Sequence, residues 1–513
     1  MEETSDLDAS DNAYFSDDHD STSENDDDDE ENLDFAPVIP EKDIKKEYEV
    51  DFTVHTESDI FKFQKSEIDQ VSSFLGGIPQ HIVASLLRHF KWNKDLLMER
   101  YMEDPDGVAR AAGVVIDDSL SAVASPKYVS INGFCCDICC NDEAGLATLA
   151  LSCEHRFCRD CYEHYLTMKI DQEGESRRIQ CMASGCKLVV DEPTIKLVVK
   201  PEVFAKYQKL LLRAFVDDLE YYKWCPAPNC VYAVEYHIGS SSLTEVIPTV
   251  HCNCGHSFCF GCSLPDHQPC ICPLVREWLK KCADDSETSN WISANTKECP
   301  KCHATIEKNG GCNHMNCRKC KYEFCWVCQG PWSEHGSQWY NCNRYDERAS
   351  VEARDAQGKS RAALEKYLHY YNRFANHEQS AKLDKDLHEK TEKKMEEMQN
   401  SSELSWIEVQ FLREAVDVLI KSRMTLKWTY AFAYYLERGN ATDLFEDNQR
   451  DLEMAVEQLS GLLEEPIAKE KIFELKQKVL DKKVYVAQRR EVLLIDTSRG
   501  LREGRWNYTA KFK

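Results

Sequence analysis

The 513-residue sequence lacks the long apolar runs from which membrane-spanning helices are built. A helix needs about 20 consecutive apolar residues to cross a bilayer, and no run approaches that length. The chain begins Met-Glu-Glu-Thr-Ser, without the basic and apolar segments of a secretory signal, and no lipidation signal ends it. We therefore expect an intracellular protein with no membrane partner. The expected location is the cytoplasm, and the sequence leaves the nucleus open as well.

Lysine and arginine are absent from the first 35 positions, which contain 16 Asp or Glu. The whole chain has a formal net charge of -26. A segment this acidic cannot bury apolar area, so residues 1–60 are predicted to form an acidic disordered tail. Phosphate binding needs a basic face, and basic clusters are sparse elsewhere in the chain. Nucleic acid is therefore not expected as a partner.

Cysteine, in contrast, is abundant: the chain has 26 cysteines, most of them in three clusters of seven cysteines and one histidine. A structural zinc ion takes four such ligands, so each cluster can hold two ions and the chain is predicted to bind six. The candidate ligands are Cys136, Cys139, Cys153, His155, Cys158, Cys161, Cys181 and Cys186; Cys225, Cys230, Cys252, Cys254, Cys259, Cys262, His267 and Cys272; and Cys299, Cys302, Cys317, Cys320, Cys325, Cys328, His335 and Cys342.

Disulfide bonds and iron–sulfur clusters explain this pattern less well. An intracellular chain keeps its thiols reduced, and matching histidines have no role in a disulfide framework. Iron–sulfur clusters need four thiolates rather than repeated sets of three cysteines and one histidine. One ligand is ambiguous, because Cys270 competes with Cys272 in the middle cluster. We favour Cys272, since the four residues that separate it from His267 give the chain room to close the site.

Cys312 is the thiol that remains in the last cluster when both zinc sites are filled. It follows the pair Gly310-Gly311 and precedes His314 by two residues. A thiolate is a strong nucleophile, and histidine changes its charge near neutral pH. The sequence therefore predicts that Cys312 is a catalytic nucleophile.

Helical periodicity predicts two regions outside the zinc clusters. In residues 61–115, apolar residues recur at helical spacing after Pro79, Asn93 can cap the next helix, and Asp104-Pro105 should end it, which predicts a three-helix unit. In residues 345–513, apolar stripes at three- and four-residue spacing predict an all-α bundle.

Two shorter helices are predicted beside the middle cluster. One covers residues 203–222, between the first and middle clusters. The other belongs to a helical linker, residues 273–295, whose apolar residues are available for packing. These apolar residues are Val275, Trp278, Leu279 and Trp291.

The triple cluster resembles the RING-between-RING (RBR) ubiquitin ligases, and within them the chain resembles the Ariadne subfamily. The resemblance covers roughly residues 66–513, with one departure, because the two residues between Cys317 and Cys320 are fewer than in the family pattern. It is carried by Trp224-Cys-Pro-Ala-Pro-Asn-Cys230, Asp285-Ser-Glu-Thr-Ser-Asn-Trp291, Lys297-Glu-Cys-Pro-Lys-Cys-His303, Gly310-Gly-Cys-Asn-His-Met315, Phe324-Cys-Trp-Val-Cys328 and Trp339-Tyr-Asn-Cys-Asn343. The helical unit around Phe90, Trp92 and Tyr101 resembles ubiquitin-associated (UBA) domains.

The resemblance implies a multidomain fold in which small zinc-stabilised modules are flanked by helical domains. A RING interleaves its ligands, so Cys136, Cys139, Cys158 and Cys161 would share one ion and the other four ligands of that cluster the second. The implied domains are the tail, 1–60; a UBA-like three-helix domain, 61–115; the first RING, 132–190; an in-between-RING zinc domain, 203–272; the helical linker, 273–295; a catalytic second RING, 296–343; and a helical Ariadne domain, 345–513.

The resemblance also implies an activity. Such a ligase would accept ubiquitin from a conjugating enzyme as a thioester on Cys312 and pass it to a lysine of a protein substrate. His314 would be the general base of the second step, and Glu323 would orient or assist it. Ile138, between two ligands of the first RING, would contact the conjugating enzyme. A surface histidine and a structural glutamate are the alternative interpretations of His314 and Glu323.

Regulation is implied as well. In the family the Ariadne domain masks the catalytic cysteine, so an autoinhibited ligase is expected, with Asp384 and Glu457 as candidate latch residues. Release would come from a neddylated cullin-RING ligase read by the UBA-like domain. Two other functions remain open: a non-catalytic RING adaptor that needs Ile138 and not Cys312, and a zinc-dependent nucleic-acid or scaffold protein.

Overall fold

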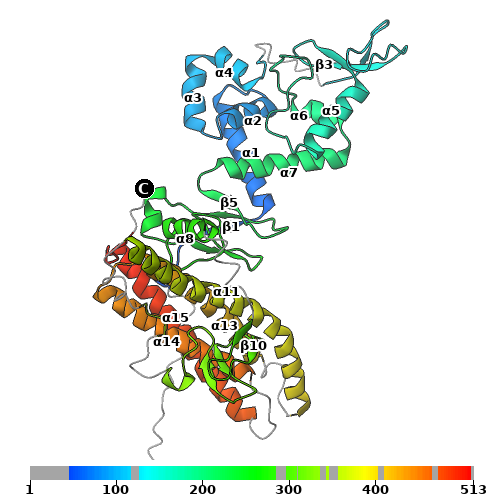
Figure 1. Cartoon of the computed structure of the whole chain (residues 1–513). Helices are drawn as coiled ribbons and strands as arrows, with labels where there is room; N and C mark the ends of the chain where they lie inside the picture. Colours follow the sequence, from blue (N-terminus) through cyan, green and yellow to red (C-terminus); the bar gives the residue numbers. More distant parts are fainter. Residues whose placement is uncertain are drawn as a thin grey trace, which may run out of the picture. The chain divides into compact units, whose positions relative to one another are not determined.

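The computed structural model of the chain describes residues 45–116, 126–284, 296–308, 310–335, 342–345, 356–401, 410–464 and 472–509. Every helix and strand of these residues falls within residues 46–513, and Figure 1 shows these elements. Among them, no helix combines the length and the apolar character that a membrane span requires. Trp291 and Trp339 of the sequence motifs lie outside the described residues.

The first helical region contains four helices rather than the predicted three. They are α1 (Glu57–Phe74), α2 (Gln80–His89), α3 (Lys94–Glu103) and α4 (Pro105–Ala112). Asn93 caps α3 as expected. Asp104 ends α3, but its side chain also accepts a hydrogen bond from Gly107 N at 2.8 Å and so begins α4. Pro105 fits the first position of a helix because its missing N–H would have no partner there. Asp104-Pro105 therefore ends α3 as predicted, and it also starts a fourth helix that was not predicted.

Residues 45–60, which fall in the predicted disordered tail, are ordered. Strand β1 (Thr53–His55) pairs antiparallel with β6 (Ala233–Glu235) in the three-stranded sheet β1-β6-β5. Glu47 accepts a hydrogen bond from Arg499 of the last helix at 2.5 Å. The only sequence sign of this strand is a short alternation of the apolar residues Val50, Phe52 and Val54, which follows a long acidic run. The disordered tail was therefore predicted to end at residue 60, which is too late.

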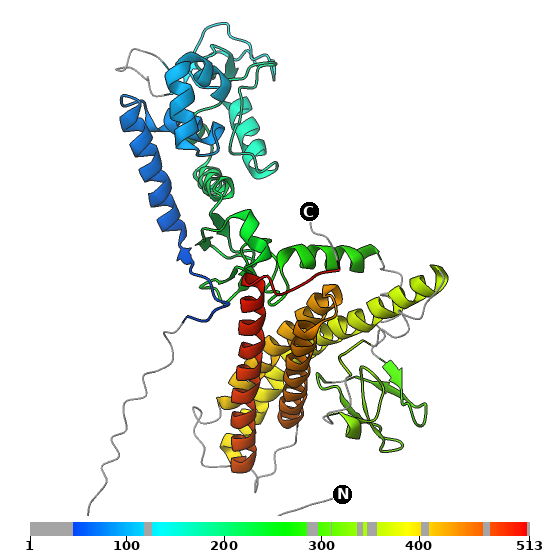
Figure 2. The same ribbon diagram turned by 90° about the vertical axis from the view of Figure 1, so that its left-hand side faces the viewer.

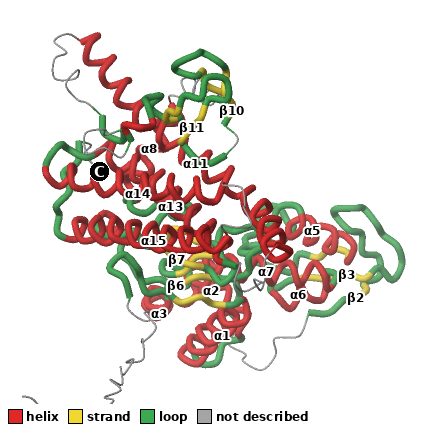
Figure 3. Tube along the Cα trace, turned by 90° about the horizontal axis from the view of Figure 1, so that it is seen from below, coloured by secondary structure: helices red, strands yellow, loops and turns green. Residues whose placement is uncertain are grey.

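The zinc modules are built from short strands and loops (yellow and green in Figure 3). The first RING has β2 (Val129–Ser130), β3 (Ala147–Ala150), β4 (Arg156–Cys158), α5 (Arg159–Asp171) and α6 (Glu192–Val198). The in-between-RING domain has β5 (Tyr222–Trp224), β6, the 3-10 helix η2 (Ser240–Thr244), β7 (Thr249–His251) and β8 (Ser257–Cys259). The second RING has the hairpins β9 (Thr296–Glu298) with β10 (Thr305–Glu307) and β11 (His314–Asn316) with β12 (Glu323–Cys325), followed by the 3-10 helix η3 (Trp332–Glu334).

The helix predicted for residues 203–222 is α7 (Pro201–Asp218). It ends four residues before the predicted limit because Tyr222 pairs with Glu235 and begins β5. Apolar periodicity alone could not separate the last helical turn from the following strand, since both are apolar on the side that packs against the UBA-like helices.

The carboxyl-terminal region is helical, as its periodicity predicts. It contains α11 (Ala356–Ser401), α13 (Phe411–Tyr435), α14 (Asn440–Glu464) and α15 (Ile472–Arg502). Helix α13 packs against the other three, and most of its residues are buried (Figures 1 and 2). A helix buried on nearly all sides is the centre of a bundle, so α13 is the element around which this domain is built.

Helix α8 (Cys272–Asp284) covers the described part of the predicted linker and packs on the bundle. Trp278 is fully buried, with its ring centroid 5.8 Å from that of Tyr367, 5.4 Å from Phe374 and 5.3 Å from Tyr434. Leu279, which the sequence also offered for packing, is 39% exposed. One face of α8 therefore fastens the in-between-RING domain to the bundle.

Trp278→Ala should destabilise the helical domain by about 3–5 kcal/mol, because it removes a large buried ring from an aromatic cluster. The measurement is chemical denaturation followed by far-ultraviolet circular dichroism. Leu279→Ala, at the next position, is the matched control and should change stability by less than about 0.5 kcal/mol. Equal effects of the two substitutions would mean that α8 does not dock through Trp278.

Candidate active site and metal centres

The structure brings the predicted ligands together in sets of four. Within each set the ligand atoms lie within 4.8 Å of one another. Five of these sets are Cys136, Cys139, Cys158 and Cys161; Cys153, His155, Cys181 and Cys186; Cys225, Cys230, Cys252 and Cys254; Cys259, Cys262, His267 and Cys272; and Cys299, Cys302, Cys317 and Cys320. The first two sets interleave along the chain, and the fifth forms despite its shortened spacing.

The remaining cysteines and histidine of the second RING also meet. Cys328 Sγ lies 3.5 Å from His335 Nε2. The side chain of Cys342 interacts with those of both Cys325 and His335. Sets of three or four thiols with at most one imidazole are the donors that tetrahedral zinc prefers. The clusters thus fit several zinc ions.

The middle cluster uses Cys272 rather than Cys270. Cys272 Sγ lies 3.4 Å from Cys259 Sγ and 3.8 Å from His267 Nε2. The Cys270 thiol lies instead in the hydrophobic cluster between α8 and the bundle. Its carbonyl accepts a hydrogen bond from His267 Nδ1 at 2.7 Å, which leaves Nε2 as the nitrogen directed at the metal position.

Cys312 lies outside all of these sets, in the turn before β11. It is 8% exposed. Its thiol donates to the backbone carbonyl of Glu457 on α14 at 3.8 Å and accepts from His314 N at 3.4 Å. Burial, and then the charge of Glu457, raise the pKa of the Cys312 thiol above its ordinary value. The thiol is therefore protonated and covered at neutral pH in this arrangement.

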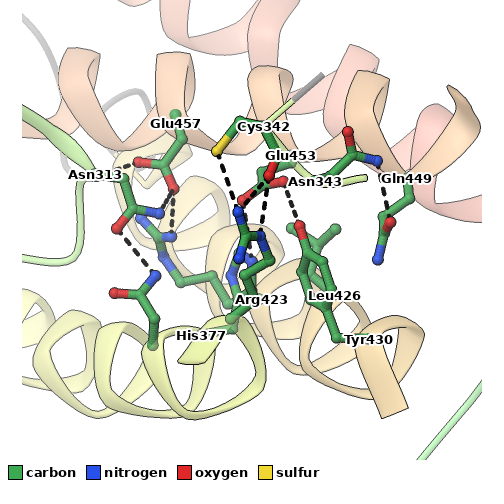
Figure 4. A network of polar contacts seen from close by, with 12 residues as sticks. Asn313, Cys342, Asn343, His377, Arg423, Leu426, Tyr430, Gln449, Glu453 and Glu457 are labelled. Atoms are coloured by element: carbon green, nitrogen blue, oxygen red, sulfur yellow. Dashed lines mark hydrogen bonds and ion pairs between the residues drawn. The ribbon is translucent and has the colours of Figure 1, made fainter. Parts of the chain in front are cut away.

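The Glu457 carboxylate holds the turn that contains Cys312. It accepts from the backbone N of Asn313 at 2.5 Å and from the Nδ2 of Asn313 at 2.8 Å. Arg423 of α13 donates to Glu457 at 2.9 Å (Figure 4). It also donates to Asp384 of α11 at 2.5 Å. Burial disfavours the charge of Arg423, but the two carboxylates still raise the pKa of its guanidinium. Three helices thus meet the second RING through one charged network.

The two glycines before Cys312 allow this approach. A Cβ built on Gly311 would overlap the Asp384 carboxylate, and one on Gly310 would overlap that of Glu464. Burial raises the pKa of both carboxyl groups, and the neighbouring Arg423 opposes that shift. A side chain at either position would therefore displace the carboxylate that it meets.

Lys308 forms a second polar contact beside Cys312. It is almost fully buried and donates to Asn313 Oδ1 at 3.0 Å, Asn376 Oδ1 at 3.1 Å and Ser380 Oγ at 2.8 Å. Burial, and then the charge of Arg423, lower the pKa of its ammonium to about 8. Lys308 therefore joins the second RING to α11.

The far end of the second RING is held as well. Arg373 of α11 donates to the backbone carbonyl of Cys342 at 3.1 Å through Nε, and a second bond comes from its Nη2. Asn343 donates to the carbonyl of Glu446 at 2.8 Å and to Gln449 Oε1 of α14 at 3.2 Å, of which Figure 4 shows the second. Both ends of the module are thus bonded to the helical bundle.

His314 and Glu323 lie together, as the sequence proposed. His314 Nε2 is 3.2 Å from Glu323 Oε2 across the β11–β12 hairpin. The His314 side chain is 35% exposed and that of Glu323 51% exposed, so both meet solvent while Cys312 does not. Ile138 is 51% exposed between two ligands of the first RING, where it is free to contact a partner.

Sequence reasoning missed several residues of this site, namely Asn313, Lys308, Arg423 and Glu464. Among them, Arg423 could have been suspected from the sequence, because it is a charged residue within the apolar face of a predicted helix. A buried charge needs a partner, but the sequence does not say which carboxylates supply it.

The chain matches sequence models of known families in four places. They are an IBR domain at residues 294–342; an IBR domain, a half RING-finger domain, at 205–272; the UBA-like domain of E3 ubiquitin-protein ligase ARIH1 at 62–103; and an Ariadne domain at 365–489. With the Cys/His clusters, these matches define a ubiquitin ligase of the RING-between-RING class. The predicted combination of UBA-like, zinc-binding and Ariadne parts is confirmed.

Known proteins narrow the class further. The chain is 54% identical over 468 residues to E3 ubiquitin-protein ligase dbl4 of Schizosaccharomyces pombe, which is 91% of each chain. It is 46% identical over 464 residues to E3 ubiquitin-protein ligase ariadne-1 of Drosophila melanogaster, 89% of this chain and 90% of the relative. It is 47% identical over 435 residues to human E3 ubiquitin-protein ligase ARIH1, 84% of this chain and 77% of the relative.

The chain belongs to the Ariadne family of RBR ligases, as its motifs indicated. It is an E3 ubiquitin-protein ligase, an enzyme that works with a ubiquitin-conjugating enzyme and ubiquitin.

Cys272→Ser should lower the zinc content of the purified chain by one ion, because Cys272 Sγ is one of four clustered donors. Cys270→Ala should leave the zinc content unchanged, although it removes a buried thiol two residues away. The measurement is metal analysis by mass spectrometry after gel filtration. Loss of an ion from the Cys270 variant alone would reverse the assignment.

Glu457→Ala should make Cys312 react with iodoacetamide at lower pH. Contact with the bundle raises the pKa of the Cys312 thiol, so this thiol stays protonated while it is covered. Rising pH therefore favours the state in which Cys312 is uncovered. In the variant the pKa falls toward about 8.5, and a fall of one unit gives about tenfold more thiolate below that pH. Peptide mapping between pH 6.5 and 9.5 measures the rate. Gln458→Ala, at the next position, is the control, and equal rates in both variants would contradict the prediction.

Proposed function

We propose that the chain transfers ubiquitin through Cys312, first as a thioester on its thiol and then as an amide on a substrate lysine. The observation that carries this proposal is the placement of Cys312. It is excluded from the Cys/His sets of the described residues, it lies two residues from the His314–Glu323 pair, and it is covered by a carboxylate-bearing helix. A thiol with only a structural role needs neither a neighbouring acid–base pair nor a removable cover.

Loading is an exchange between two thioesters. The Cys312 thiolate attacks the carbonyl carbon of the ubiquitin carried by the conjugating enzyme, and the enzyme's sulfur leaves. The bonds formed and broken are alike, so the step needs no further energy input. It does need the thiolate, which the covered arrangement suppresses by raising the pKa.

Transfer to lysine requires a general base. A lysine amine has a pKa of about 10.4 and is mostly protonated at pH 7, so a base must take up its proton. His314 is the base in this proposal, and Glu323 holds its ring through Nε2. Their exposure supports these roles, since the substrate amine has to reach them.

The zinc ions have structural roles in this scheme. We assign six ions, two to each module, to the sets of donors described above. Modules with so little apolar core depend on metal binding, which supplies on the order of 10 kcal/mol per site. In the second RING, the ligands flank the segment that carries Cys312 and His314 and would fix its course.

Ile138 and the UBA-like domain supply the contacts with partners. Ile138 presents an exposed apolar side chain in the first RING (132–190), and we assign it to the conjugating enzyme. The UBA-like domain (61–115) would read the ubiquitin-like modifier of a neddylated cullin-RING ligase. This last assignment rests on the family resemblance.

The Ariadne domain (345–513) would act as an inhibitor of the catalytic RING (296–343). Glu457 and Asp384 are its latch residues in this proposal, joined through Arg423. Removing one partner from a buried charge network costs about 3–5 kcal/mol, because another charge is left without a partner. The Arg423 ion pairs lie within the bundle, so an activator would instead have to break the bonds from Asn313 to Glu457 and from Lys308 to α11 before Cys312 could be loaded.

The full-length chain carrying Asp384→Ala and Glu457→Ala should form a ubiquitin thioester faster than the wild type. It is incubated with activating enzyme, a cysteine-reactive conjugating enzyme and ubiquitin, and the products are separated on a non-reducing gel. The adduct should be cleaved by thiol reagents, be absent in Cys312→Ala, and resist thiols in Cys312→Ser, because an ester replaces the thioester.

Two outcomes would contradict parts of this proposal. Equal loading of the latch variant and the wild type would remove the autoinhibitory role of Asp384 and Glu457. Ubiquitin chains built by Cys312→Ala, with no adduct on any variant, would make the chain a RING adaptor that needs Ile138 and not Cys312.

A further inference from the structure

We propose that Trp332 is a positioning residue for the transfer of ubiquitin to lysine, because its indole fixes the plane of the His314 ring. This inference rests on the proposed role of His314 as general base. It adds a residue that neither the cysteine pattern nor the Cys312–His314–Glu323 set includes.

Three aromatic rings are stacked in this part of the second RING. The Trp332 ring centroid lies 4.4 Å from that of His314, with 10° between the planes. It also lies 4.9 Å from the His335 ring centroid, with 13° between the planes. Trp332 is thus stacked with both the proposed base and a proposed zinc ligand.

The His335 side of this stack is anchored. His335 Nε2 lies 3.5 Å from Cys328 Sγ in a metal-ligand set, and its Nδ1 lies 3.1 Å from the carbonyl of Pro331. Pro331 in turn forms a bridge with Phe324 of β12. Metal ligation and the Nδ1 bond together fix a ring at both nitrogens. The Trp332 indole therefore rests on a ring that cannot turn.

The His314 side lacks such an anchor of its own. Its described side-chain hydrogen bond is the one to Glu323, whose carboxylate is half exposed. One bond at the end of a ring leaves rotation about the Cβ–Cγ bond, where histidine has a broad torsional minimum. Stacking on Trp332 removes this rotation. The indole sets the plane of the ring, and Glu323 sets its direction within that plane.

The same contacts determine which ring nitrogen of His314 accepts the proton. A carboxylate only accepts hydrogen bonds, so His314 Nε2 carries its proton toward Glu323 and Nδ1 is left as the proton acceptor. In the transfer step the lysine nitrogen attacks the carbonyl carbon of the Cys312 thioester, and the carbon–sulfur bond breaks. The electron pair leaves with sulfur as the Cys312 thiolate, and the amine proton passes to Nδ1.

Trp332 also faces the reaction centre. Cys312, His314 and Trp332 line one cavity of about 690 Å³, whose opposite wall comes from α14 and α15. The indole is therefore a wall of the space in which the proposed chemistry occurs, and not only a packing residue behind it. Loading of Cys312 involves no amine proton, so the loss of Trp332 should affect transfer and spare loading.

The test uses the full-length chain with the Asp384→Ala and Glu457→Ala latch changes as parent. Trp332→Leu and Trp332→Phe are added to it, and Tyr322→Leu is the matched aromatic control in the same module. Each protein is loaded with ubiquitin, ATP is removed with apyrase, and loss of the thioester is timed after free lysine is added. Zinc content is measured for every variant.

Trp332→Leu should load within about twofold of the parent and discharge to lysine at least about tenfold more slowly, since a positioned base contributes about 100-fold or more. Trp332→Phe keeps a stacking face and should recover discharge to within about threefold of the parent. Tyr322→Leu should discharge as the parent does. In nuclear magnetic resonance spectra, the His314 ring protons should be shifted upfield in the parent and in Trp332→Phe, and not in Trp332→Leu.

The possible outcomes distinguish a failure of the Trp332 inference from a failure of the proposed ubiquitin transfer through Cys312. If the parent forms no thioester on Cys312, the proposed function fails and the role of Trp332 fails with it. If the parent loads normally and all Trp332 variants discharge at the parental rate, only the positioning role is wrong. If Trp332→Leu loses zinc, or slows loading and discharge equally, the indole is structural and the inference is overturned.

Discussion

Ligation of metal by cysteine and histidine is the interaction on which the catalytic half of this protein depends. The described residues of the second RING contain four short strands and few buried apolar side chains, so its chain course depends on its two sets of donors. The segment that carries Cys312 and His314 lies between Cys302 and Cys317, two members of the first of these sets. Metal binding that supplies on the order of 10 kcal/mol per site can hold such a segment where packing could not.

The contact between the second RING and the helical bundle follows a different principle. It relies on charged groups removed from water, with Arg423 between Asp384 and Glu457, and with Lys308 on three neutral acceptors. Buried ion pairs add little net stability, because desolvation offsets their attraction, but they are specific in geometry and costly to break singly. A contact of this kind is suited to reversible closure, since both surfaces are polar enough to be exposed to water again.

A feature of the fold could be predicted when the residues that form it are close together in the sequence, and not when they are far apart. Asn93 as a helix cap and the helical bundle follow from neighbouring residues and could be predicted. Helix α4 and strand β1 were missed for different reasons. The first depends on Asp104 serving two helices at once, which the usual effect of proline conceals. The second depends on a partner strand about 180 residues away, which no local pattern reveals.

The sequence by itself determined the chemistry of this protein: which cysteines and histidines are available as zinc ligands, which thiol is left over, and which histidine lies beside it. These facts depend on spacings of a few residues, within which the chain can reach only a few geometries. The tertiary structure decided what surrounds that chemistry. It alone placed Glu457 against the turn of Cys312, Arg423 behind Glu457, and Trp332 in stacking contact with two imidazole rings. The reason is physical: burial and stacking depend on how separate elements meet. Glu457 and Arg423 lie more than 100 positions from Cys312, and Trp332 lies 18 positions from His314, so these residues come together only in the folded chain.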